Sequence, residues 1–218
     1  MTPERWQSTR AYMDAVFGGT DGSHAGVMER ATAAGMPSID AGPATGKLLM
    51  LLATVTRAEM AIEVGTLAGY SAIWIARGMM PGGRLITVEA SAKHAAFAQK
   101  ELDSAGVSER VHIRQGKGGE VLPAILRERG PGKTDLIFLD AERSEYLPLL
   151  PTIEQLLRPG GILAIDNALS AQRWVPDAYG PNEQPDVMDT VNRTVAGHKA
   201  FVSLVLPVGN GVLVATKR

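Results

Sequence analysis

The sequence predicts an α/β fold in which a mostly parallel sheet is covered by helices on both faces. From Met60 onward, short apolar segments alternate with longer segments of helical spacing, which is typical of parallel strands connected by crossover helices. Turns rich in Gly and Pro, as at residues 81–83 and 159–161, separate these segments. The end of the chain differs, because two apolar segments flank the Gly-Asn-Gly turn at 209–211 and strands joined so closely must be antiparallel.

Seven segments are expected as strands. Five of them are short and apolar, as a sheet buried on both sides requires: Ala61–Val64, Arg84–Glu89, Val111–Gln115, Asp135–Asp140 and Gly161–Asp166. The antiparallel pair at the end is Ala200–Leu206 and Val212–Thr216. Helical spacing is found in the segments between the first five strands: Tyr70–Met79, Ser91–Ala105, Gly119–Glu128 and Tyr146–Leu157.

Three further helices are expected before the first strand, at Glu4–Phe17, Ser23–Ala34 and Thr45–Thr56. The 218 residues are enough for one sizeable α/β domain and few for two. We therefore expect a single domain over residues 1–218, with a helical prelude at 1–57 and an α/β core at 58–218.

The composition excludes several classes of partner and site. The 22 basic and 23 acidic side chains nearly balance and form no basic run, so no nucleic-acid partner is expected. The absence of cysteine excludes disulfides, thiolate nucleophiles and Cys-ligated zinc. No secretory signal is seen, and the longest apolar run, Leu48–Ala53, is too short to cross a bilayer. A cytoplasmic protein without a membrane partner is expected.

The stretch Met60–Glu89 predicts a binding site for a nucleoside. It has the strand, glycine turn, helix and strand of a nucleotide-binding β-α-β unit, and Glu89 ends the second strand, where a carboxylate suits ribose hydroxyls. The turn reads Glu63-x-Gly65-x-x-x-Gly69, which departs from G-x-G-x-x-G. A carboxylate before the turn would repel a pyrophosphate and suit a cationic ligand, such as the sulfonium of S-adenosylmethionine. Glu89 fits either cofactor, so an NAD(P)-dependent oxidoreductase is the alternative.

Polar side chains close the fourth and fifth strands, at Asp140 and at Asp166-Asn167. In a doubly wound sheet, neighbouring strand ends point into the same crevice. Two carboxylates and an amide carbonyl suit a hard divalent cation, with Mg²⁺ first and Ca²⁺ or Mn²⁺ as alternatives. The same side chains could instead cap loops or helix starts, and the pattern leaves both interpretations open.

Other catalytic patterns are missing. The four histidines fall within predicted helices or a strand, without ligand spacing, and are expected to be surface or packing residues. There is no G-x-S-x-G turn, and no Ser, His and Asp fall at positions that indicate a triad.

From Pro43 to the C-terminus the chain resembles the cation-dependent small-molecule O-methyltransferases, typified by catechol and caffeoyl-CoA O-methyltransferases and their bacterial relatives. Five segments carry the resemblance in order: IEVGTLAGYSA, RLITVEAS, DLIFLDAERSEY, LLRPGGILAIDNAL and SLVLPVGNGVLVATKR. The resemblance implies a Rossmann-like methyltransferase sheet of seven strands with an antiparallel last strand. It also implies S-adenosylmethionine, a divalent cation, a hydroxylated small-molecule acceptor of catechol type, and a homodimer.

The resemblance also implies roles for individual residues. The cofactor-binding positions are Ala41, Glu63, Gly65, Thr66, Ser71, Glu89, Gly118 and Asp140. The metal ligands are Asp140, Asp166 and Asn167, and the catalytic positions are Asp140 and Arg143. The acceptor pocket is expected to be built from the N-terminal helices and residues 168–189.

One position departs from the family. The motif after the fourth strand reads Asp140-Ala141-Glu142-Arg143, whereas the family usually has lysine at the last position as general base. Arginine stays protonated, so Arg143 cannot accept a proton, and we expect it to stabilise an oxyanion. The missing lysine also raises the alternative of a cofactor-binding relative with weakened catalysis.

Overall fold

The computed structural model describes residues 3–17, 26–39, 41–169 and 187–218. Its seven-stranded sheet has the order β3-β2-β1-β4-β5-β7-β6. The strands are β1 (Met60–Val64), β2 (Arg84–Glu89), β3 (Val111–Gln115), β4 (Thr134–Leu139), β5 (Leu157–Ile165), β6 (Phe201–Leu206) and β7 (Val212–Lys217). The pairs among β1 to β5 are parallel, and β7 runs antiparallel to both of its neighbours. The predicted sheet with an antiparallel last strand is confirmed.

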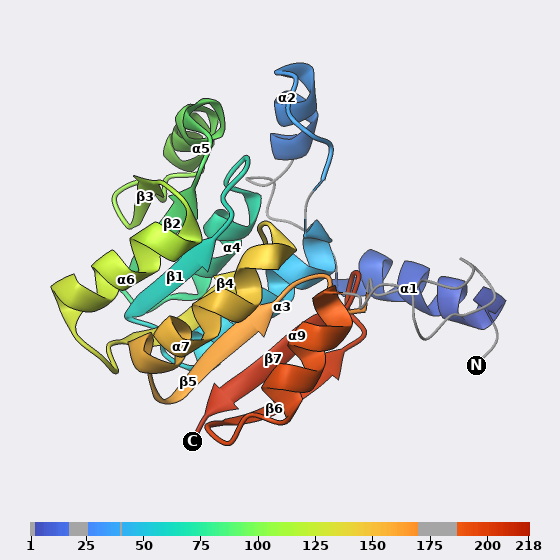
Figure 1. Cartoon of the computed structure of the whole chain (residues 1–218). Coiled ribbons are helices and arrows are strands. Elements are labelled where there is room, and N and C mark those ends of the chain that lie inside the picture. Colours follow the sequence, from blue (N-terminus) through green and yellow to red (C-terminus); the bar gives the residue numbers. More distant parts are fainter. Residues whose placement is uncertain (1–2, 18–25, 40, 170–186) are drawn as a thin grey trace.

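Helices cover both faces of this sheet (Figure 1). They are α1 (Pro3–Phe17), α2 (Val27–Ala33), α3 (Gly42–Val55), α4 (Tyr70–Gly78), α5 (Ala92–Ser104), α6 (Gly118–Arg129), the 3₁₀ turn η1 (Arg143–Glu145), α7 (Tyr146–Leu156) and α9 (Val187–Ala196). One face packs against α3, α4 and α5, and the other against α6, α7 and α9. None of the helices in the described ranges is long and apolar enough to cross a membrane.

The two-residue period of a strand divides the core into two clusters. In β1, Met60, Ile62 and Val64 join the cluster under α6 and α7, whereas Ala61 joins the cluster under α3 and α4. Burying a side chain the size of Ile62 contributes about 1.5–3 kcal/mol, so each strand helps to hold helices on both faces. Glu63 is fully buried on the same strand, which apolar periodicity alone does not explain.

Helix α9 was not predicted, although its buried residues Met188, Val191 and Val195 have helical spacing. The helix begins inside the segment 168–189 that we expected to line the acceptor pocket. The polar residues of that segment made the short amphipathic pattern of the helix hard to recognise. Residues 170–186 of that segment lie outside the described residues, so its predicted role is untested.

Most other boundaries lie within a few residues of prediction. Strand β5 begins at Leu157 instead of Gly161, because Leu157 pairs with Thr134 ahead of a shift in the register between β4 and β5. Helix α2 begins at Val27, after a glycine with a φ of 74°, and the predicted start at Ser23 lies outside the described residues.

Candidate cofactor and metal site

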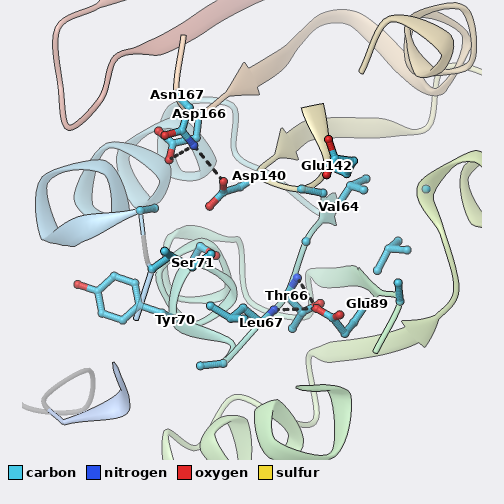
Figure 2. A pocket seen from close by; sticks show the side chains of 18 of the residues that line it. Val64, Thr66, Leu67, Tyr70, Ser71, Glu89, Asp140, Glu142, Asp166 and Asn167 are labelled. Carbon is cyan, nitrogen blue, oxygen red and sulfur yellow. Dashed lines mark hydrogen bonds between the residues drawn. The ribbon is translucent and has the colours of Figure 1, made fainter. Parts of the chain in front are cut away.

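A pocket of about 660 Å³ lies at the carboxyl ends of β1, β2, β4 and β5 (Figure 2). Parallel strands place their carboxyl ends at one edge of the sheet, which is where ligands bind in open α/β folds. The lining includes ten of the predicted site residues: Ala41, Gly65, Thr66, Ser71, Glu89, Gly118, Asp140, Arg143, Asp166 and Asn167. The fold therefore brings residues that are far apart in the sequence to one pocket.

Gly65 brings the loop after β1 against the loop after β4. Its φ is 101°, and a Cβ added there would lie 1.9 Å from the backbone oxygen of Asp140. The Asp140 amide donates to the Val64 carbonyl at 2.9 Å, so a backbone hydrogen bond joins the two loops directly beside Gly65. Only glycine allows this approach and this backbone conformation, so Gly65 places the Asp140 carboxylate beside the turn.

Glu89 organises the turn between β1 and α4. Its Oε2 accepts from the backbone amides of Thr66 at 3.2 Å and Leu67 at 2.8 Å (Figure 2). Its Oε1 accepts from the Ser91 amide at 2.9 Å. Oε1 accepts only one of these bonds and has a second lone pair, so Glu89 can hold the loop and still accept from a ligand hydroxyl. His94, predicted as a surface or packing residue, has its Nδ1 3.5 Å from Glu89 Oε1 and does not line the pocket.

Glu63 lies beneath the pocket and does not line it. Thr87 Oγ1 donates to Glu63 Oε2 at 2.6 Å, and Glu63 Oε1 is buried without a hydrogen-bond partner among the described residues. Burial in the sheet raises the pKa of the Glu63 carboxyl to about 8. Glu63 therefore does not reach the pocket surface in this structure, and its predicted contact with the cofactor stays a prediction.

We expect the substitution Glu63→Gln to remove a pH dependence of stability. The folded protein keeps the Glu63 proton up to a pKa of about 8, whereas the unfolded chain releases it near 4.5. The free energy of unfolding should therefore fall as pH rises between these values, by up to about 1.4 kcal/mol per pH unit from this group. The variant should gain stability relative to wild type from pH 6 to pH 8, measured by urea unfolding.

The exposed residue Glu109 offers a matched control for this measurement, since Glu109→Gln makes the same chemical change at the surface. Its stability should track that of wild type across the pH range. A Glu63→Gln variant that also tracks wild type would contradict the prediction.

The three predicted metal ligands come together at one wall of the pocket. Asn167 Nδ2 donates to Asp140 Oδ1 and to Asp166 Oδ2, both at 3.3 Å (Figure 2). Asn167 has a φ of 61°, a left-handed conformation that Asn tolerates better than most residues. An amide N–H, the positive end of a dipole, therefore bridges two carboxylates, and Asn167 can offer its oxygen to the same point instead.

This donor set fits a hard divalent cation. Carboxylate and amide oxygens are the ligands that Mg²⁺, Mn²⁺ and Ca²⁺ prefer. No group of three His, Cys, Asp or Glu side chains suited to a metal is found within residues 3–17, 26–39, 41–169 and 187–218. A cation at this wall would thus rely on two carboxylates and one amide.

The family model for O-methyltransferases matches residues 25–218. The chain belongs to the O-methyltransferase family. It is 40% identical to a catechol O-methyltransferase from Niastella koreensis over 169 residues, which are 78% of this chain and 76% of that protein. A catechol O-methyltransferase from Mycobacterium tuberculosis is 35% identical over 73% of this chain and 70% of its own length.

Solved structures of O-methyltransferases share the fold over nearly the whole length. The enzyme from Bacillus cereus, in complex with SAH, has a TM-score of 0.86 and 30% identity, with 99% of each chain covered. TomG from Streptomyces achromogenes, in complex with SAM, has a TM-score of 0.84 and 28% identity, with 100% of this chain and 99% of that chain covered. The resemblance found in the sequence is confirmed, and the oxidoreductase alternative has no support.

The loop of this O-methyltransferase that carries Arg143 is held by a tyrosine that sequence reasoning missed. Tyr146 donates from its hydroxyl to the Ala141 carbonyl at 3.0 Å and accepts from the Ala141 amide at 2.9 Å. Burial raises the pKa of Tyr146 above its ordinary value, so this phenol cannot act as a general base in place of lysine. Arg143 is exposed at the start of η1 and lines the pocket.

Proposed function

We propose that this O-methyltransferase transfers a methyl group from S-adenosylmethionine to a hydroxyl of a catechol-like small molecule, with the help of a divalent cation. The observation that carries the proposal is one pocket with two chemically different walls. The glycine turn and Glu89 form one wall, and the oxygen-rich set Asp140, Asp166 and Asn167 forms the other.

The first wall suits the nucleoside and the methionine portion. Both Glu89 oxygens are held by backbone amides, so the carboxylate is fixed in position to accept from ribose hydroxyls. Ser71 and Gly65 would face the methionine portion, and Gly118 and Ala41 would contribute backbone contacts. S-Adenosylmethionine supplies a methyl group that its sulfonium already activates. The solved O-methyltransferases with bound SAH or SAM support this assignment.

The second wall suits the acceptor. Asp140, Asp166 and Asn167 would hold a divalent cation, and the cation when bound would lower the pKa of a coordinated acceptor hydroxyl. Three protein ligands are fewer than such a cation takes, so these residues would leave room beside it for two neighbouring acceptor oxygens. The relatives named catechol O-methyltransferase support a vicinal diol as acceptor.

Arg143 is proposed to stabilise negative charge on the acceptor oxygen. Its guanidinium keeps its proton at any working pH and therefore cannot take a proton from the acceptor. It lies at the same pocket as Asp140 and can donate hydrogen bonds to an oxyanion. The acceptor proton would then leave to solvent and not to a side chain at position 143.

Catechol is expected to be methylated by the protein with S-adenosylmethionine and Mg²⁺, whereas phenol is expected to react far more slowly. Phenol has one oxygen where catechol has two. A site built to hold two neighbouring oxygens beside Asp140, Asp166 and Asn167 would therefore position phenol less well. Mass spectrometry of the products measures the difference, and calorimetry with S-adenosylmethionine against NAD tests the cofactor. A protein that binds NAD but not S-adenosylmethionine would overturn the proposal.

Two further outcomes would test the acceptor and the catalytic activity separately. Equal rates with phenol and catechol would contradict the vicinal-diol assignment. Binding of S-adenosylmethionine without transfer to any vicinal diol would favour the cofactor-binding relative. The predicted homodimer and cytoplasmic location stay predictions.

A further inference from the structure

A second amide contacts the amide of Asn167. Asn210 Nδ2, in the turn between β6 and β7, donates to Asn167 Oδ1 at 3.2 Å. Asn167 in turn donates from Nδ2 to Asp140 Oδ1 and Asp166 Oδ2, both at 3.3 Å. The donors thus all point one way, from Asn210 through Asn167 to the two carboxylates. Asn210 also lines the pocket.

The backbone holds Asn210 in place beside Asn167. The Ala168 amide donates to the Gly211 carbonyl at 2.8 Å, and the Leu169 amide donates to the Asn210 carbonyl at 2.9 Å. Gly211 has a φ of 85°, and a Cβ there would lie 2.4 Å from Leu169 Cγ. The turn is therefore docked on the two residues that follow Asn167, and the contact between the two side chains rests on a fixed backbone.

The chemistry of an amide makes this contact a switch between two orientations. To offer its oxygen to a cation, the Asn167 amide must turn by half a rotation, which brings its NH₂ group toward Asn210. An amide at 210 can follow by rotating and accepting with its own oxygen. A carboxylate at 210 could only accept, and an apolar side chain could do neither.

We propose that Asn210 is a positioning residue that controls whether Asn167 presents its amide oxygen or its amide nitrogen to Asp140 and Asp166, and so sets the affinity of the site for a divalent cation. The inference rests on the proposed metal-dependent function. Outer partners of metal ligands generally change metal affinity by about 10–100-fold when they are removed.

The test measures the dissociation constant of Mn²⁺ for the SAH-saturated protein, by calorimetry and by the electron paramagnetic resonance signal of free Mn²⁺. Asn210→Asp should tighten binding, because a carboxylate accepts from the Asn167 NH₂ and holds its oxygen toward the carboxylate pair. Asn210→Leu can neither donate to Asn167 nor accept from it, so it favours neither orientation and should change the affinity for Mn²⁺ much less than Asn210→Asp does. Circular dichroism and the melting temperature show that each variant is folded.

A double-mutant cycle separates positioning from charge. In an Asn167→Ala background, the effect of Asn210→Asp should largely disappear if it acts through the Asn167 amide. Equal tightening in that background means that added charge alone acts, and the inference is overturned. If wild type binds Mn²⁺ and neither Asn210 variant changes its affinity, the inference fails and the proposed function stands. If wild type binds no Mn²⁺, the proposed metal dependence fails, and the inference with it.

Discussion

Removal of divalent cations is expected to abolish methyl transfer by this enzyme while its fold stays intact. The carboxylates of Asp140 and Asp166 converge on one point with Asn167. A cation held there is proposed to stabilise the negative charge that develops on the acceptor oxygen, and so to lower the activation barrier by several kcal/mol. Because 1.4 kcal/mol is a factor of ten, turnover should fall on the order of 10³-fold. The measurement compares methylation of catechol by protein treated with EDTA and by the same protein after addition of Mg²⁺.

Two variants sharpen this result. Asp166→Ala should remove cation binding and turnover together, because it deletes one of the two carboxylates. Arg143→Ala should lower turnover less and keep cation binding, because Arg143 lines the pocket without belonging to the oxygen set. Full activity in metal-stripped protein would rule out the cation-dependent mechanism.

Gly65→Ala is expected to destabilise the protein by several kcal/mol and to abolish binding of SAH. The new Cβ would lie 1.9 Å from the backbone oxygen of Asp140, a contact that only backbone movement can relieve. The φ of 101° adds strain of about 1–3 kcal/mol for a residue with a Cβ. Movement of Asp140 away from Gly65 would displace both the cofactor turn and the carboxylate. Urea unfolding and calorimetry with SAH measure the two losses.

Gly82 offers a matched control for this substitution. It also has a positive φ, 79°, but a Cβ there would meet nothing within 4 Å. Gly82→Ala should therefore show only the backbone strain and should keep SAH binding. Equal losses in the two variants would mean that the close approach of Gly65 to Asp140 does not matter, and that backbone strain alone explains the effect.

Most strands and turns could be predicted from the sequence because their signals are local. Strand β2 was predicted at its observed bounds, Arg84–Glu89, since its apolar residues lie between a glycine turn and a carboxylate. Glu89 itself was identified from its place at the end of that strand. The candidate metal ligands were predicted in the same way, because Asp140 and Asp166 each follow a buried strand that ends at the same edge of the sheet.

Other features escaped prediction because they depend on which atoms a side chain meets in the folded chain, which periodicity does not show. Glu63 was predicted as a cofactor-binding residue, and only the fold shows that its side chain is fully buried and accepts from Thr87 on the neighbouring strand. Tyr146 was seen only as part of a motif, and its role in holding the loop of Arg143 depends on its hydroxyl meeting the backbone of Ala141.

The sequence by itself determined the fold class, the cofactor turn and the oxygen-rich strand ends, because periodicity and turn chemistry are properties of neighbouring residues. Only the tertiary structure decided which of these residues touch. The placement of β7 between β5 and β6 brings Asn210 to Asn167, and the φ of Gly65 lets its turn meet Asp140. Such contacts follow from the order of the strands in the sheet, which no local pattern records.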